Sequence, residues 1–161
     1  MAIHYHPSAV FDCNIFLQAA VRDTGPSFAC LAAVEAGLVQ LVISPAVIAE
    51  IEQVLNRESM QHKFPQLVPK IVDEYISRII ALAVVKNKIP QAFFFPRDPK
   101  DEPYINLAIA SKVEYLVSRD KDLLDLMDDQ SSTGQLFKKD FPSLIILTPV
   151  GFLEVLRKNE S

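Results

Sequence analysis

The stretch Ala9-Val10-Phe11-Asp12-Cys13-Asn14 decides how the rest of the chain is interpreted. Its first three residues are apolar, which is typical of a short buried strand, and a carboxylate follows directly. A second, mostly apolar and β-branched run covers 38–43. Ser44 and Pro45 then have the pattern of a helix start, with Ser44 as N-cap and Pro45 in the first helical position. Helical stretches over 14–21 and 26–36 separate the two apolar runs. A strand, a helix and another strand in this order indicate a βαβ unit.

The same alternation continues along the chain. Apolar runs predict five strands, and capped or amphipathic stretches between them predict helices. The expected strands cover 9–12, 38–43, 83–85, 115–118 and 144–147, and the expected helices cover 14–21, 26–36, 45–55, 68–82, a segment that starts near Asp101 and a last one that starts at Thr148-Pro149. Residues 128–143 are polar and are expected to form an irregular surface excursion. We therefore predict an α/β protein, a three-layer α/β/α sandwich around a central, mostly parallel, Rossmann-like sheet of about five strands, with a single domain over residues 1–161.

The composition limits the classes of function. Half of the 161 residues are hydrophobic, and the formal net charge of −4 argues against a nucleic-acid binder that works through overall basicity. Cys13 and Cys30 form no CxxC pair and are expected to be buried, reduced thiols. No apolar run approaches the ~20 residues needed to span a bilayer, and the N-terminus lacks the pattern of a signal peptide. A cytoplasmic protein without a membrane segment is expected.

Four acids follow or flank the predicted strands. Asp12 ends the first strand, Asp120 comes just after the fourth, Glu50 lies on the helix after the second, and Asp101 starts the helix before the fourth. Ligands of parallel sheets bind beyond the carboxyl ends of the strands, so these acids can converge there. Packed carboxylates raise one another's pKa unless a cation neutralises them, and Mg²⁺ and Mn²⁺ prefer such oxygen ligands. The sequence therefore predicts a catalytic metal site.

Each acid also has a plain structural explanation. The acids that could instead cap helices are Asp12 for the helix over 14–21, Asp101 for the helix that it starts, and Asp120 for a short helix over 121–127. Glu50 could be a solvated helix acid. Asp98 and Asp122 are expected to cap turns or support the ligands and not to bind the metal themselves. The joint placement of the four acids favours the metal site.

Competing chemistries lack their motifs. The chain contains no GxGxxG after the first strand, no GxxxxGK[ST] and no GxSxG. Asn14 stands where an aspartyl-phosphate hydrolase needs a second aspartate. The chain has three histidines, His4 and His6 in the leader before the first strand and His62, and the predicted fold places none of them near the acids. A nucleophilic triad is therefore hard to build.

Five segments carry a resemblance to a known family. They are Val10-Phe11-Asp12-Cys13-Asn14; Ser44-Pro45 with Glu50-Ile51 and Val54-Leu55-Asn56-Arg57; Asp98-Pro99-Lys100-Asp101 leading to Leu107-Ala108; Leu116-Val117-Ser118-Arg119-Asp120-Lys121-Asp122-Leu123-Leu124; and Ile146-Leu147-Thr148-Pro149 with Phe152-Leu153. In this order the chain resembles a PIN domain, in particular the bacterial and archaeal PIN proteins that are toxins of toxin–antitoxin pairs (VapC-like ribonucleases). Cys13 departs from the usual Thr or Ser, and Ser118 replaces the commoner Thr.

The resemblance implies a Mg²⁺- or Mn²⁺-dependent endoribonuclease. Asp12, Asp101 and Asp120 would hold the principal ion, and Glu50 would bind a second ion or orient the water. Water bound to such an ion has a lowered pKa, so no histidine base is required. Asn14 and Ser118 would aim the carboxylates. Cys13 would weaken or tune the positioning of the metal.

The implied partners are RNA, an antitoxin protein and a second copy of the chain in a homodimer. The basic residues nearest to the acids in sequence, which could contact RNA, are Arg57, Arg97, Lys100, Arg119 and Lys121. Phe93-Phe94-Phe95 cannot all point inward from a loop, which indicates a protein interface; these rings and Tyr104 could also stack on bases. The alternative function is a catalytically weak or inactive PIN-like interaction module, and a weaker one is a metal phosphatase.

Overall fold

A five-stranded sheet lies at the centre of the computed structural model, which describes residues 6–159. The strands are β1 (Ser8–Phe11), β2 (Gln40–Ile43), β3 (Val84–Val85), β4 (Tyr115–Val117) and β5 (Ile145–Leu147). They pair in the order β3-β2-β1-β4-β5, and every neighbouring pair is parallel. The prediction of a central parallel sheet is confirmed. β1 lies in the middle, so the residue that follows it reaches the centre of the carboxyl edge.

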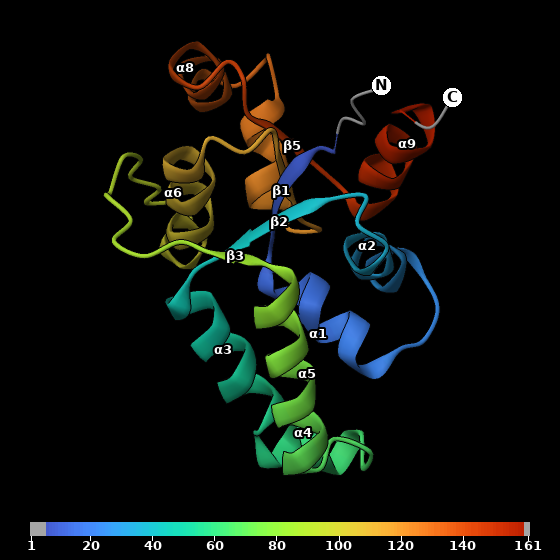
Figure 1. Ribbon diagram of the computed structural model, residues 1–161. Coiled ribbons are helices and arrows are strands. Elements are labelled where there is room, and N and C mark those ends of the chain that lie inside the picture. The colour runs from blue at the N-terminus through green and yellow to red at the C-terminus, as the bar shows by residue number, and fades with distance from the viewer. Residues whose placement is uncertain (1–5, 160–161) are drawn as a thin grey trace.

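Helices connect the strands and cover both faces of the sheet. They are α1 (Cys13–Val21), α2 (Pro26–Glu35), α3 (Pro45–Leu55), α4 (Glu58–Lys63), α5 (Pro69–Leu82), the 3₁₀ turn η1 (Pro99–Asp101), α6 (Glu102–Ser111), α7 (Lys121–Leu124), the 3₁₀ turn η2 (Asp125–Met127), α8 (Ser132–Asp140) and α9 (Pro149–Asn159). In Figure 1, α2 and α9 lie side by side on one side of the sheet and α6 lies on the other, which gives the three-layer α/β/α sandwich. The segment from α3 to α5 extends beyond the carboxyl end of β1.

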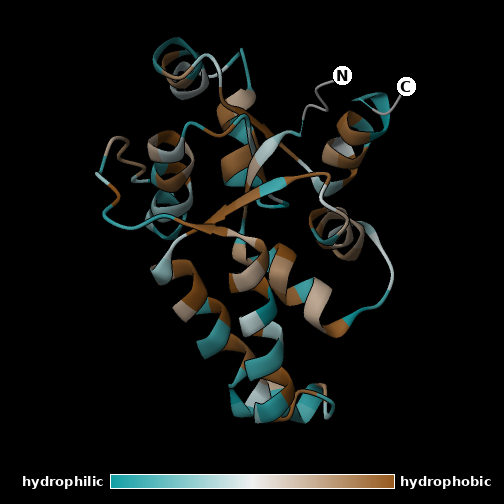
Figure 2. Cartoon of the chain, in the orientation of Figure 1, coloured by the Kyte–Doolittle hydropathy of each residue, from teal (hydrophilic) through white to brown (hydrophobic). Residues whose placement is uncertain are grey.

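The central strand is buried on both faces, as a parallel sheet between helical layers requires. Ala9, Val10 and Phe11 are at most 1% exposed. The ring of Phe11 lies 5.9 Å, centroid to centroid, from the rings of both Phe16 and Phe152, so α1 and α9 pack on it. Figure 2 shows the apolar colouring concentrated on the strands and on the inner faces of the helices. This packing fixes the direction in which β1 delivers the residues after Phe11.

The start of α3 follows the predicted local chemistry. The Ser44 hydroxyl oxygen accepts the N–H of Val47 at 3.2 Å, and Pro45 occupies the first helical position. The predicted N-cap is confirmed, and it orients the helix that carries Glu50. Among residues 6–159, no helix is both long and apolar enough to cross a membrane.

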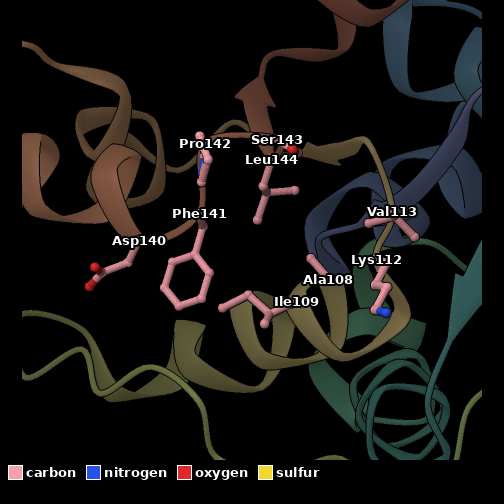
Figure 3. A pocket seen from close by; sticks show the side chains of 9 residues that line it. All are labelled: Ala108, Ile109, Lys112, Val113, Asp140, Phe141, Pro142, Ser143 and Leu144. Atoms are coloured by element: carbon pink, nitrogen blue, oxygen red, sulfur yellow. The ribbon is translucent and has the colours of Figure 1, made fainter.

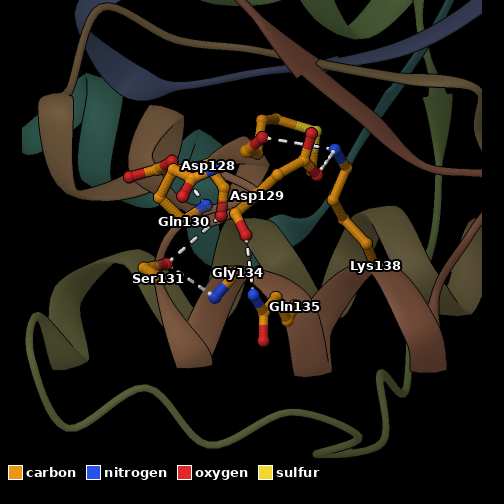
Figure 4. A network of polar contacts seen from close by, with 8 residues as sticks. Asp128, Asp129, Gln130, Ser131, Gly134, Gln135 and Lys138 are labelled. Carbon is orange, nitrogen blue, oxygen red and sulfur yellow. Dashed lines mark hydrogen bonds and ion pairs between the residues drawn. The ribbon is translucent and has the colours of Figure 1, made fainter.

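The prediction for residues 128–143 is wrong, because α8 forms there. The Ser131 hydroxyl oxygen accepts the Gly134 N–H at 2.9 Å as an N-cap, and the Lys138 ammonium lies 2.6 Å from the Asp129 carboxylate (Figure 4). Phe137 is fully buried, with its ring 5.1 Å from that of Phe93. Packing of this one ring stabilises a helix that is otherwise polar except for the exposed Leu136. The signal was present as a serine cap followed by aromatic residues four apart, Phe137 and Phe141.

Candidate metal centre

Neighbouring parallel strands bring the first acids together. β1 pairs with β4, and the backbone N–H of Asp12 continues this pairing with a 2.9 Å bond to the Val117 carbonyl. Asp12 therefore stands at the carboxyl end of β1, beside the segment that carries Ser118 and Asp120. This edge of the sheet is where ligands of such folds bind.

A pocket of about 300 Å³ lies at this edge. Its lining residues are Asp12, Cys13, Asn14, Leu17, Glu50, Val54, Arg57, Asp98, Lys100, Asp101, Tyr104 and Asp120. The four acids that the sequence singled out all lie in this one pocket, although they come from four separate segments. The fifth acid in it is Asp98.

The tightest cluster consists of Asp98, Asp101 and Asp120. Each offers one carboxylate oxygen, and these oxygens lie within 4.8 Å of one another. Asp98 was expected to cap a turn or to support the ligands. The capping role is confirmed, because its carboxylate accepts the Lys100 N–H at 3.2 Å, and the same carboxylate also lies close to the other two acids. The i, i+3 spacing of Asp98 and Asp101 across a 3₁₀ turn, which places both on one side, could have indicated this.

Asp101 carries the clearest electrostatic signature in the pocket. Its side chain is 5% exposed, and its Oδ2 atom has no hydrogen-bond partner in the described part of the chain. Burial, followed by the nearby charges of Asp120, Asp98 and Asp12, raises the pKa of Asp101 to about 8. A buried acceptor without a donor is costly unless a cation or a proton occupies the place in front of it.

Ser118 links the two strand-end acids. Its hydroxyl donates to Asp12 Oδ2 at 2.6 Å, and its oxygen accepts the Asp120 N–H at 2.9 Å. Burial raises the pKa of Asp12, and the Ser118 hydroxyl opposes this effect. The aiming role expected for this hydroxyl is thus matched by a contact. Asn14 lines the pocket, but its side chain has no hydrogen-bond partner within residues 6–159.

Glu50 lies in the pocket but apart from the tight cluster. Its Oε2 atom accepts a 2.7 Å hydrogen bond from the Tyr104 hydroxyl, and Tyr104 is only 2% exposed. Tyr104 is therefore a buried anchor for Glu50 and is not free to stack on a base. Sequence reasoning missed this contact, although Tyr104 follows Asp101 by three residues and so lies on the same side of α6.

Cys13 lies beside this pair. It is 5% exposed, and burial together with the nearby charge of Glu50 raises its pKa to about 12. The thiol is therefore protonated at neutral pH and offers no thiolate ligand. Cys30 is likewise buried and free, so the expectation of two buried, reduced thiols is confirmed.

Removal of the anchoring hydroxyl by Tyr104→Phe is expected to release Glu50. We expect the free energy of unfolding to fall by about 1 kcal/mol, because one hydrogen bond is lost. We expect metal-dependent phosphodiester cleavage to slow by about tenfold, because Glu50 loses its fixed position. Urea titrations and single-turnover cleavage rates measure the two effects.

Tyr75→Phe is the matched control for this change. In the unchanged chain, the Tyr75 hydroxyl donates to the Phe16 carbonyl at 2.6 Å, outside the acid pocket. The control should lose a similar amount of stability and keep the full cleavage rate. Equal cleavage by both variants would contradict a role for Tyr104 in holding Glu50.

Arg97, which precedes the turn η1, forms ion pairs with α7 and η2. The Arg97 Nη2 atom lies 2.6 Å from Asp122 Oδ1 and 2.8 Å from Asp125 Oδ2. Asp98 follows this arginine directly, and Asp120 is the N-cap of the helix that carries Asp122. The ion pairs therefore join the segments that supply the three clustered acids. Asp122 does not line the acid pocket, and its supporting role stays a prediction.

The other prominent hollows lack such a cluster. A cavity of about 300 Å³ lies at the far end of α6, and its wall carries just two charged side chains, Lys112 and Asp140 (Figure 3). His6 and His62 do not line the acid pocket, and His4 lies outside the described residues. Among the described residues, the acid pocket therefore offers no imidazole, and carboxylates are the most numerous titratable groups on its wall.

A parallel α/β sandwich with clustered carboxylates at its central carboxyl edge defines a class of protein suited to bind divalent cations. A family model described as PIN domain matches residues 8–122, which is most of the chain. The chain belongs to the PIN domain family, whose members are generally metal-dependent nucleases. No curated protein and no solved structure matches the chain.

The residues present fit the divalent metal that the family typically uses. The donors are hard carboxylate oxygens, which suit Mg²⁺ and Mn²⁺ and not soft metals. Asp101, which belongs to the cluster, also has an unpartnered, buried Oδ2 atom that a cation could satisfy. Burial and then repulsion by the neighbouring acids raise the pKa of Asp101, and a cation would remove the repulsion.

Proposed function

We propose that this protein is a Mg²⁺- or Mn²⁺-dependent endoribonuclease that hydrolyses phosphodiester bonds, and that it serves as the toxin of a toxin–antitoxin pair. The observation that carries the proposal is the cluster of Asp98, Asp101 and Asp120 in a PIN domain, in which Asp101 has an unpartnered, buried carboxylate oxygen. The acid pocket is also open to solvent, as a polymer substrate requires, since Glu50 and Lys100 on its wall are exposed.

The proposed roles follow from the contacts. Asp101 and Asp120 would hold the cation, with Asp98 as a third ligand and Asp12, aimed by Ser118, as a fourth. Glu50, fixed by Tyr104, would accept a hydrogen bond from the attacking water. When bound, the cation would neutralise charge on the phosphate and lower the pKa of nearby water. The neutral thiol of Cys13 would contribute packing beside Glu50.

A substrate panel tests this function. The protein is incubated with end-labelled RNA, DNA of the same sequence and p-nitrophenyl phosphate, with Mg²⁺, Mn²⁺ or EDTA. We expect internal cleavage of RNA with either metal, none in EDTA, and little or no hydrolysis of the other substrates. Hydrolysis of p-nitrophenyl phosphate without RNA cleavage would instead favour a metal phosphatase.

The second candidate is a PIN-like interaction module with weak or no activity. Cys13 favours it, because a buried thiol replaces the hydroxyl that the family usually has beside the acids. Calorimetric titration with Mn²⁺ separates the candidates: a nuclease should bind at millimolar concentration or below, and an inactive module should not.

Surface features support protein partners. Phe94 is 69% exposed, whereas Phe95 is 2% exposed and the Phe93 ring packs on those of Phe95, Phe137 and Phe141. The edge strand β3 also exposes Val84 and Val85. We propose an antitoxin or a second copy of the chain as the cover of such surfaces. A small neighbouring reading frame whose product relieves growth arrest on co-expression would support the antitoxin.

A further inference from the structure

The basic residues near the acids differ in what holds them. Arg97 is bound by two aspartates, and Arg119 donates to the Gln18 side chain at 3.0 Å. Lys121 does not line the acid pocket. Of the five cations that the sequence placed near the acids, two form part of the pocket wall: Arg57 and Lys100.

These two side chains have no polar partner in the described part of the chain. Neither makes a hydrogen bond or an ion pair within residues 6–159, although five carboxylates line the same pocket. Lys100 even lies between Asp98 and Asp101 in sequence. Both side chains are exposed. Their donors are therefore available to an anion that approaches the pocket from solvent.

The backbone of each residue is nevertheless fixed. The Arg57 carbonyl accepts the N–H groups of Met60 and Gln61 at the start of α4, and the Lys100 N–H donates to Asp98 Oδ1. The two cations thus project from ordered segments, one between α3 and α4 and one in η1. A fixed backbone with free side-chain donors is the arrangement expected of two cations in a binding site, and not of cations in a mobile tail.

We propose that Arg57 and Lys100 bind backbone phosphates of the RNA beside the acid cluster. The inference rests on the proposed ribonuclease function and adds the residues that recognise the substrate. A chain with a net charge of −4 repels RNA overall, so its affinity must come from local cations. Arginine supplies a planar fork of donors for phosphate, and lysine supplies a compact charge.

The test measures binding apart from cleavage. Fluorescence anisotropy follows a labelled single-stranded RNA with the full chain carrying Asp101→Asn, which prevents cleavage. Into this parent are placed Arg57→Gln, Lys100→Gln, or both, and as matched controls Arg22→Gln and Lys139→Gln, which remove the same charges from exposed residues outside the acid pocket.

Arg57→Gln and Lys100→Gln are each expected to raise the Kd for RNA by about 5–10-fold and to reduce the salt dependence of log K by about 0.7, the value for one single-strand phosphate contact. The controls should stay within about twofold of the parent. In the otherwise unchanged chain, Mn²⁺ affinity should not fall in Arg57→Gln, because the arginine is not a ligand.

The outcomes separate this inference from the proposed function. Equal losses in the pocket variants and the controls would overturn the inference and leave the ribonuclease function standing. Absence of RNA binding by the parent, together with no RNA cleavage by the unchanged chain, would overturn both. Retained RNA binding with a loss confined to the two pocket variants supports the phosphate-binding pair.

Discussion

Asp101→Asn is expected to abolish metal-dependent cleavage in a chain that still folds. Asparagine keeps the shape of the side chain but removes the buried charge that faces Asp98 and Asp120. Loss of one anionic ligand should weaken Mn²⁺ binding and slow cleavage by about 100-fold or more, since changes even to groups that only support ligands have effects of about 10–100-fold. Calorimetry and cleavage kinetics measure the two losses.

The same substitution should stabilise the metal-free protein. In EDTA at pH 8, Asp101→Asn is expected to raise the free energy of unfolding by about 2 kcal/mol, because a buried carboxylate without a partner is removed. Gain of stability with loss of activity is typical of a site that is strained for function. Asp140→Asn is the control, because this acid lines the other cavity and should change neither property by much.

The stability of the metal-free protein should fall as the pH rises from about 5 to about 8. The pKa of Asp101 is about 8 in the folded chain and 3.8 in an unperturbed aspartate, so between these values the folded state binds the extra proton. Stability therefore falls with pH in this window, with a slope of at most about 1.4 kcal/mol per pH unit for one proton. Burial and the neighbouring acids are the cause of the raised pKa of Asp101.

Mn²⁺ should remove this slope, because a cation takes the place of the proton and binds the folded state alone. Thermal unfolding at pH 5.5 and pH 8, with EDTA or with Mn²⁺, measures the effect. We expect the stabilisation by Mn²⁺ to be larger at pH 8 by about 3 kcal/mol. A slope that persists unchanged in Asp101→Asn would mean that another group is responsible.

Much of the fold could be predicted from local patterns. The run before Asp12, the cap at Ser44-Pro45 and the acid that follows the fourth strand each carry their signal within a few residues. The helix α8 also has a local signal, the serine cap and the aromatic pair, but the packing partner of Phe137 is Phe93, which lies more than forty positions earlier in the sequence. The polar composition of residues 128–143 therefore led to the wrong prediction of an irregular segment.

The sequence by itself determined that acids follow the strands of a parallel sheet, and parallel strands deliver such residues to one edge because their carboxyl ends coincide. Only the tertiary structure decided which acids are neighbours. The turn in η1 places Asp98 in the tight cluster. Glu50 lies apart from it and is hydrogen-bonded to a tyrosine on another helix. The distances from Asp98 to Asp120 and from Glu50 to Tyr104 depend on how separate segments pack, which no local spacing predicts.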